Sequence, residues 1–109
     1  MATFKLNPSP GDKFHFTLVA DNHEKVLTSE TYNDRSGALA GIESVRRNSQ
    51  DDAHYEKKVS ARGQHFFVLK AANGEPIGTS EEYSSEAAML DGIAVIKKLA
   101  REANLQGEE

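Results

Sequence analysis

The sequence repeats itself once at a spacing of 51 residues, and this duplication limits the fold more than any other feature. Shifting the chain by 51 positions aligns its halves without a gap, so that Phe16 and Leu18 recur as Phe67 and Leu69. The polar stretch LTSETYND (27–34) has its counterpart in GTSEEYSS (78–85). We therefore expect a single domain, residues 1–109, built from internal repeats 1–51 and 52–109.

Each repeat begins with three extended segments. Apolar and polar side chains alternate along 14–20 and 65–71, which is typical of half-buried strands. Asn73-Gly74 predicts a type I′ hairpin turn, and Asn22-His23 is its less favourable counterpart. The six strands that we expect cover residues 3–6, 14–20, 26–29, 54–59, 65–71 and 77–80.

Each repeat ends in an amphipathic helix, over 34–48 and 85–103. Asn33 or Asp34 and Ser84 or Ser85 are the expected N-caps. The residues expected on the buried faces are Ala38, Leu39, Ile42, Val45, Met89, Leu90, Ile93, Ile96 and Ala100.

Both helices carry a glycine at mid-length, Gly41 and Gly92, where glycine costs about 1 kcal/mol relative to alanine. This cost indicates that each helix closely approaches the sheet or the other helix at that point. Exposure of the helix backbone to a ligand is the alternative that we consider weaker.

One β-β-β-α unit cannot bury both a sheet face and a helix, whereas two units related by a pseudo-twofold axis can. We therefore expect an α+β fold, in which two tandem repeats form one antiparallel sheet with both helices packed on one face. Because the two repeats already complete a pseudo-dimer, we expect a monomer.

The segment NGEPIGTSEEYSSEAAMLDGIAVIKK and its divergent first copy resemble the YegP-like family of small bacterial proteins. That family is identified by an N-G-x-x-I/V-x-x-S-E-x-Y-x-S segment that leads into a helix with a central Gly-Ile. In the first copy, Asn22-His23 replaces Asn-Gly and Asn33-Asp34 replaces the serine pair. The resemblance implies an α+β fold whose repeats share one sheet and exchange terminal strands. It implies no activity and carries over no catalytic residue.

Composition excludes several classes of protein and of site. The chain has no cysteine and no apolar run long enough for a membrane span, and no export signal is visible, so we expect a cytoplasmic protein. A net charge of -4 argues against nucleic acid as the partner. The four histidines show no metal-ligand spacing, and no nucleotide or nucleophile motif is present, so we expect neither a metal nor a cofactor.

The duplicated polar stretch is the first candidate site. Its hydroxyl, carboxylate and phenol groups could bind a small polar ligand or support acid–base chemistry, which gives the hypothesis of an enzyme or ligand binder with two pseudo-equivalent sites. No His or Lys recurs beside it to activate a serine, so we favour a strand-to-helix junction serving both repeats. The residues of these two corners are Ser29, Glu30, Tyr32, Ser80, Glu81 and Tyr83.

The sheet face opposite the helices is the second candidate site, and our leading hypothesis is a non-enzymatic binding or protein-interaction module that uses it. One alternative is an ordinary solvated sheet face without a binding function. A weaker alternative is that the face binds single-stranded nucleic acid. Alternation places Glu56, His54 and Thr17 on this face beside the candidate contacts. Those contacts are His15, Val19, Leu27, Lys58, Phe66, Val68 and Lys70.

Overall fold

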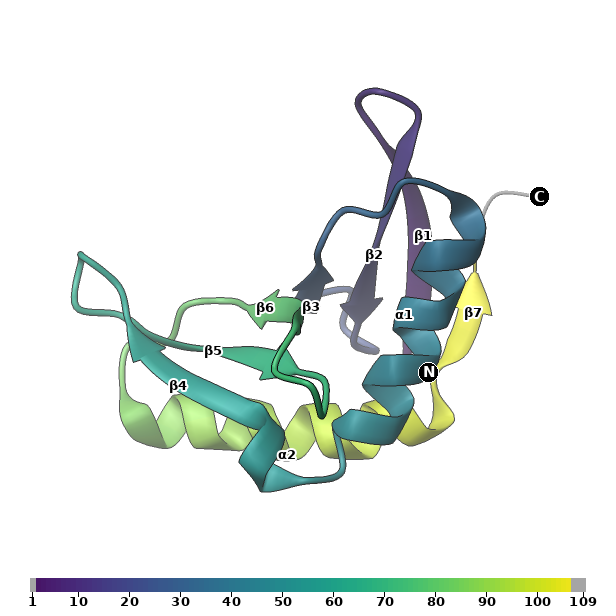
Figure 1. Ribbon diagram of the computed structural model, residues 1–109. Coiled ribbons are helices and arrows are strands. Elements are labelled where there is room, and N and C mark those ends of the chain that lie inside the picture. The colour runs from purple at the N-terminus through teal and green to yellow at the C-terminus, as the bar shows by residue number, and fades with distance from the viewer. Residues whose placement is uncertain (1, 107–109) are drawn as a thin grey trace.

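The computed structural model describes residues 2–106 and shows one seven-stranded sheet with two α-helices (Figure 1). The predicted α+β fold of two tandem β-β-β-α repeats is confirmed. In chain order the elements are β1 (Thr3–Ser9), β2 (Lys13–Val19), β3 (Lys25–Ser29), α1 (Arg35–Asn48), the short 3-10 helix η1 (Asp52–His54), β4 (Tyr55–Val59), β5 (His65–Lys70), β6 (Pro76–Ser80), α2 (Glu86–Glu102) and β7 (Asn104–Gln106).

The two repeats meet in the middle of the sheet, whose strand order is β4-β5-β6-β3-β2-β1-β7. Strands β3 and β6 are antiparallel, with Thr28 opposite Thr79. These two threonines are also repeat counterparts, 51 residues apart, so the pseudo-twofold axis passes between them. Such an axis stands perpendicular to an antiparallel pair, and it leaves both helices on the same face.

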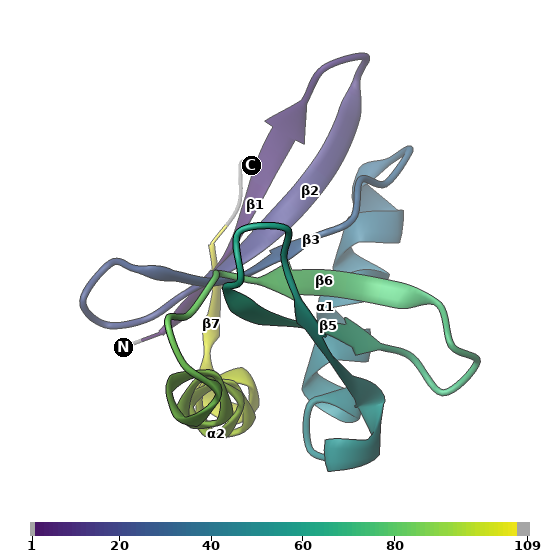
Figure 2. The same cartoon turned by 90° about the vertical axis from the view of Figure 1, so that its left-hand side faces the viewer.

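The sheet bends sharply at this junction, and the helices lie on the outer side of the bend (Figures 1 and 2). Helix α1 lies against the arm formed by β1–β3, and α2 runs along the arm formed by β4–β6. Between helices and sheet lies one apolar core. Its largest fully buried side chains are Phe4, Phe16, Leu18, Leu27, Ile42, Val45, Phe67, Leu69, Met89 and Ile96.

Leu27 belongs to this core with none of its surface exposed, so its assignment to the opposite face was wrong. A β-bulge is the reason. Leu18 lies opposite Leu27 but the next residue, Val19, lies opposite Lys25, which leaves Val26 as an extra residue in β3. A bulge breaks strict alternation. Val26 and Leu27 consequently both contribute to the core, and the second repeat has the same irregularity in β6.

No periodicity predicted strand β7, but the family resemblance implied that terminal strands are exchanged between the repeats, and β7 is such a strand; it makes the sheet mixed rather than wholly antiparallel. It follows α2 of the second repeat but pairs in parallel with β1 of the first, at Thr3–Lys5. All three of its residues are exposed, so no alternation in the sequence indicates it. The pseudo-twofold axis relates the place of β7 to the space beyond β4, at the other edge of the sheet. No strand among residues 2–106 lies there.

The hairpin turns also differ from expectation. Type I′ requires two residues with positive φ, but within the β5–β6 turn only Gly74 has one, at 87°. The Gly74 N–H donates to the Ala71 carbonyl at 2.9 Å, and the Ala71 N–H donates to the Glu75 carbonyl at 2.9 Å. Gly74, the residue with left-handed backbone, therefore comes after the two central residues of the turn, Ala72 and Asn73. His23, with φ of 71°, takes the corresponding place in the first repeat.

The helix starts follow the sequence prediction. Asp34 caps α1 by accepting from the Gly37 N–H at 2.7 Å, and Ser85 caps α2 by accepting from the Ala88 N–H at 3.1 Å. Leu90 is an exception to the predicted buried face, since 43% of its surface is exposed. It lies on the edge of the apolar stripe of α2 that turns away from the sheet.

The burial of Leu27 and the exposure of Leu90 give a matched test of this arrangement. Leu27→Ala should lower the free energy of unfolding by about 2–5 kcal/mol because it leaves a cavity in the core. Leu90→Ala should change it by less than about 0.5 kcal/mol. Urea denaturation followed by circular dichroism measures both, and equal losses would contradict the bulged register of β3.

Candidate functional site: the polar corners and the inner sheet face

The serine hydroxyl of each corner forms hydrogen bonds with two backbone groups. In the first corner the Phe16 N–H donates to Ser29 Oγ at 2.8 Å, and that hydroxyl donates to the Glu30 carbonyl at 2.7 Å. In the second corner the distances are 3.0 Å from the Phe67 N–H to Ser80 Oγ and 2.8 Å onward to the Glu81 carbonyl. Each hydroxyl therefore joins two segments of the chain as the strand gives way to the helix.

The tyrosine of each corner lies over its helix. Tyr32 stacks on Phe16 with ring centroids 6.1 Å apart, and Tyr83 stacks on Phe67 at 6.5 Å. A Cβ at Gly41 would lie 2.7 Å from Cζ of Tyr32, and one at Gly92 would lie 2.7 Å from Cζ of Tyr83. Contact with these rings thus requires the mid-helix glycines. A Cβ at Gly41 would also lie 2.9 Å from Cε2 of Phe16 in β2, so the predicted close approach to the sheet is confirmed in the first repeat, whereas at Gly92 the close neighbour is Tyr83.

Burial raises the pKa of both corner tyrosines, and neighbouring carboxylates reinforce the effect. Glu30 acts on Tyr32, and Glu81 and Glu24 act on Tyr83. A raised pKa keeps the phenol neutral, which is unfavourable for a general base at neutral pH.

A hollow of about 530 Å³ lies beside the second corner, and Glu81 and Tyr83 contribute to its lining while Ser80 does not. Its other residues are Glu24, Lys25, Val26 and Glu82. The hypothesis of a ligand site at the corners stays a hypothesis, but its serine and tyrosine already have structural roles.

The inner side of the bend is the sheet face that no helix covers (Figures 1 and 2). A row of small side chains crosses it, because Thr17 lies opposite Thr28, Thr28 opposite Thr79 and Thr79 opposite Val68. Thr17 is only 2% exposed, as expected deep inside a bend. The row ends at Lys5 on one arm and at Glu56 on the other.

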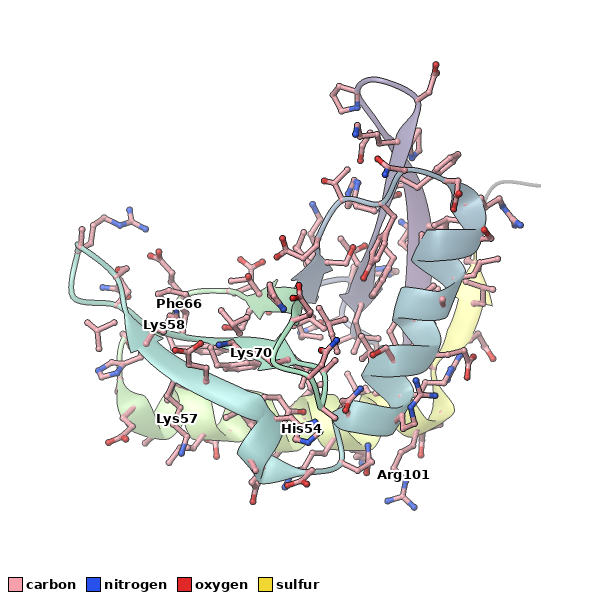
Figure 3. All side chains as sticks on the ribbon, in the orientation of Figure 1. His54, Lys57, Lys58, Phe66, Lys70 and Arg101 are labelled. Atoms are coloured by element: carbon pink, nitrogen blue, oxygen red, sulfur yellow. The ribbon has the colours of Figure 1, made fainter. Side chains whose placement is uncertain are left out.

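Most of the predicted contact residues share this face. Figure 3 shows Lys58, Phe66 and Lys70 on the inner side, whereas Lys57 lies on the side of α2. Phe66 and Val68 are half-buried, and Val19 is 9% exposed. His15 lies opposite Asn7 on the other arm. Of the seven predicted contacts, Leu27 alone belongs to the core cluster between the sheet and the helices.

The charges on the second arm are compensated. Glu56 forms an ion pair with Lys70 at 2.5 Å and a longer one with Lys58 at 4.0 Å. The hydrogen bond from Lys70, together with the charges of Lys58 and Lys70, lowers the pKa of the Glu56 carboxyl. Lys58 and Lys70, the two lysines among the predicted contacts, therefore already share a carboxylate and are less suited to bind the phosphates of a nucleic acid.

Three cationic or titratable residues of this face, Lys5, His23 and Lys25, were missed by the sequence analysis. Together with His15 they line a hollow of about 220 Å³ on the first arm. Comparing equivalent positions of the two repeats would have identified two of these residues. Lys5 corresponds to Glu56 and His23 to Gly74, so both positions change their chemistry between the repeats.

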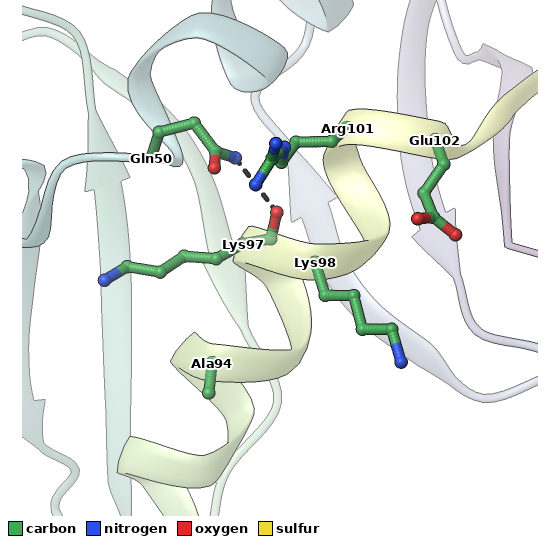
Figure 4. A pocket seen from close by; sticks show the side chains of 6 residues that line it. All are labelled: Gln50, Ala94, Lys97, Lys98, Arg101 and Glu102. Carbon is green, nitrogen blue, oxygen red and sulfur yellow. Dashed lines mark hydrogen bonds between the residues drawn. The ribbon is translucent and has the colours of Figure 1, made fainter.

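A further hollow of about 540 Å³ lies on the outer surface along α2 (Figure 4). Gln50 Nε2 donates to the Lys97 carbonyl at 2.9 Å there, and Lys97 forms an ion pair with Asp52. The side chains of Lys97 and Lys98 extend in different directions rather than toward a common point. Arg101 lies in the last turn of α2, where its charge favourably offsets the helix dipole.

Within the part of the chain that the structure describes, no three His, Asp or Glu side chains are grouped so that they could bind a metal ion. Neither helix in that part is long and apolar enough to cross a membrane.

Comparison with known proteins places this architecture among relatives. The model of the family described as "Domain of unknown function (DUF1508)" matches twice, over residues 10–56 and 60–106. A UPF0339 protein of Pseudomonas aeruginosa is 45% identical over 107 residues, which cover 98% of this chain and 97% of that protein. The UPF0339 protein YegP of Escherichia coli K12 is 44% identical over 94 residues, 86% of either chain.

Solved structures agree with the fold. The solution structure of YegP from Escherichia coli, described as a protein of unknown function, superposes with a TM-score of 0.91 at 38% identity, covering 98% of this chain and 92% of that one. The solution structure of a UPF0339 protein from Shewanella oneidensis gives 0.90 at 42% identity, with 97% and 90% covered.

The contact between Tyr83 and Gly92 can be tested with a double-mutant cycle. Gly92→Ala alone should destabilise the protein by about 1 kcal/mol, because overpacking outweighs the gain in helix propensity. In a Tyr83→Leu background the same change should stabilise it by about 1 kcal/mol. Thermal denaturation measures the cycle, and additive effects would contradict this role for the tyrosine.

The tyrosines also predict an alkaline transition. Burial raises the pKa of all three, most strongly for Tyr55, whose hydroxyl donates to the Ser49 carbonyl at 2.8 Å. Because the folded pKa exceeds the unfolded value, this stabilisation is complete below about pH 10 and decreases as pH rises above it. Tyrosinate absorbance should therefore appear together with loss of circular dichroism. Ionisation near pH 10 in a protein that remains folded would contradict the prediction.

Proposed function

The chain belongs to the DUF1508 family of UPF0339 proteins, and on that premise we propose that it is a non-enzymatic binding module that docks another protein on the inner face of its bent sheet. The same proposal assigns it to the cytoplasm, which suits a chain without cysteine, and cell fractionation with immunodetection tests that location.

One observation carries the proposal. Phe66 and Val68 lie on a sheet face that no helix covers, beside a row of buried or half-buried threonines. An aromatic side chain such as Phe66 on an uncovered face is of the type that is enriched in protein interfaces. The bend allows such a partner to contact both arms at once.

The occupant we propose is an extended segment of another protein that carries both apolar and acidic side chains. The apolar side chains would pack on Phe66 and Val68. Charge complementarity favours the acidic ones, because Lys5 and Lys25 border the same face and form no ion pair among residues 2–106. Nucleic acid is less well supported, because the protein has a net charge of -4 and Glu56 neutralises part of the second arm.

An affinity capture with matched variants tests the proposal. The immobilised chain should retain one or more specific proteins from a lysate of the source cells, and Phe66→Ser should lose them. Leu90→Ser, which changes an exposed apolar residue on the outer surface, should retain them. Circular dichroism must show that both variants are folded.

Capture that Phe66→Ser leaves intact would overturn the proposal, as would capture that only Leu90→Ser abolishes. Retention of no specific protein at all would also count against it.

A further inference from the structure

The two arms of the inner face differ in charge at equivalent positions. On the second arm, Glu56 pairs with Lys70 and Lys58. On the first arm the residue corresponding to Glu56 is Lys5. A compensating carboxylate in one repeat is thus a cation in the other, although the backbone register around both is the same.

Cationic and hydrogen-bonding side chains gather around Lys5 in a hollow of about 220 Å³. They come from three adjacent strands, β1, β2 and β3, and from the turn that joins the last two. No carboxylate belongs to this lining. The hollow that shares Lys5 and His23 with it contains one, Asp21, and the hollow beside the second corner, which shares Lys25, contains three glutamates. The lining consists of Lys5, Asn7, His15, Thr17, Val19, His23 and Lys25.

His23 adds an observation of a different kind. It has φ of 71°, in the left-handed region that disfavours side chains, whereas its counterpart in the second repeat is glycine. An imidazole has therefore been placed at a position where glycine would have cost less backbone strain. Strained residues of this kind gather where a side chain has a task, and this side chain lines both hollows.

Two further groups equip the hollow to bind an oxyanion. Ser9 Oγ lies 2.6 Å from Nδ1 of His15, which fixes the ring and leaves Nε2 without a hydrogen-bond partner among residues 2–106. Thr17, a nearly buried residue with a hydroxyl group, also belongs to the lining. Ammonium, imidazole N–H and hydroxyl groups all donate, and a negatively charged acceptor makes their hydrogen bonds stronger.

We propose that this hollow binds a carboxylate side chain of the acidic segment that docks on the inner face. The inference rests on the proposed function and specifies the partner's chemistry. A protein segment fits both arms, since its carboxylates meet Lys5 and Lys25 while its apolar side chains meet Phe66 and Val68. A nucleic acid would place phosphates along the whole face, including beside Glu56.

The test is a titration of the ¹⁵N-labelled chain with hexaglutamate at low salt, followed by NMR. Amide signals of Lys5, His15, His23 and Lys25 should shift with hexaglutamate and stay unchanged with hexaglutamine. Lys5→Glu, which restores the carboxylate of the second repeat, should weaken binding about tenfold. Lys98→Glu makes the same charge change on the outer surface and should alter affinity by less than about twofold.

Two further variants separate binding from folding. His23→Gly should weaken binding several-fold while the melting temperature stays equal or rises, because the strain is removed. Glu56→Lys should create a second set of shifts at Lys58 and Lys70. A loss of binding that merely follows loss of stability would contradict the assignment of His23.

Other outcomes overturn the inference. Hexaglutamate binding that Lys98→Glu abolishes, or that Lys5→Glu leaves unchanged, would place the anion elsewhere. Tighter binding of oligothymidylate than of hexaglutamate to the same residues would identify a nucleic acid as the ligand. If inorganic phosphate binds there and hexaglutamate does not, the ligand is a small free oxyanion. Capture lost in Phe66→Ser but retained in Lys5→Glu would overturn the carboxylate site and leave the proposed function standing.

Discussion

The short pairing between β3 and β6 is the interaction on which the rest of the structure depends. It is the one ladder that joins the two repeats at the centre of the sheet, and it is centred on Thr28 and Thr79. Because of it, each helix packs beneath a continuous sheet rather than a separate three-stranded arm, and one core serves both repeats. The bend at this ladder also creates the inner face. The same contact thus stabilises the fold and forms its most distinctive surface.

The polar corners show how a cluster of functional groups that recurs in both repeats can have a structural role. Serine, glutamate and tyrosine recur together, yet Ser80 bonds to two backbone groups and Tyr83 occupies the space above Gly92. In both repeats the tyrosine and its glycine are nine residues apart, as in Tyr32 and Gly41. The corner and the mid-helix glycine are therefore two parts of one packing motif.

Much of this fold was predictable from the sequence because the duplication and the alternation of apolar residues are local patterns. The N-caps at Asp34 and Ser85 followed from residue type and position. Leu27 was misplaced because a bulge depends on the register of the partner strand, which no single segment reveals. Strand β7 carries no pattern at all. The inner face was anticipated as a surface, but the hollow around Lys5 emerges only when strands distant in sequence are aligned across the sheet.

The unequal edges of the sheet have a consequence for how copies of this chain meet. Pairing with β7 covers Thr3–Lys5 of the outer edge of β1, whereas β4 lies at the other edge with Lys57 and Lys58 in its exposed portion. Lysines on an edge strand hinder the addition of a further strand. A symmetric duplicate with two bare ends would be a building block for an endless ribbon. Here the edge strand at one end, β7, has only three residues, and the edge strand at the other end carries two exposed lysines, so both ends have features that oppose pairing with a further copy.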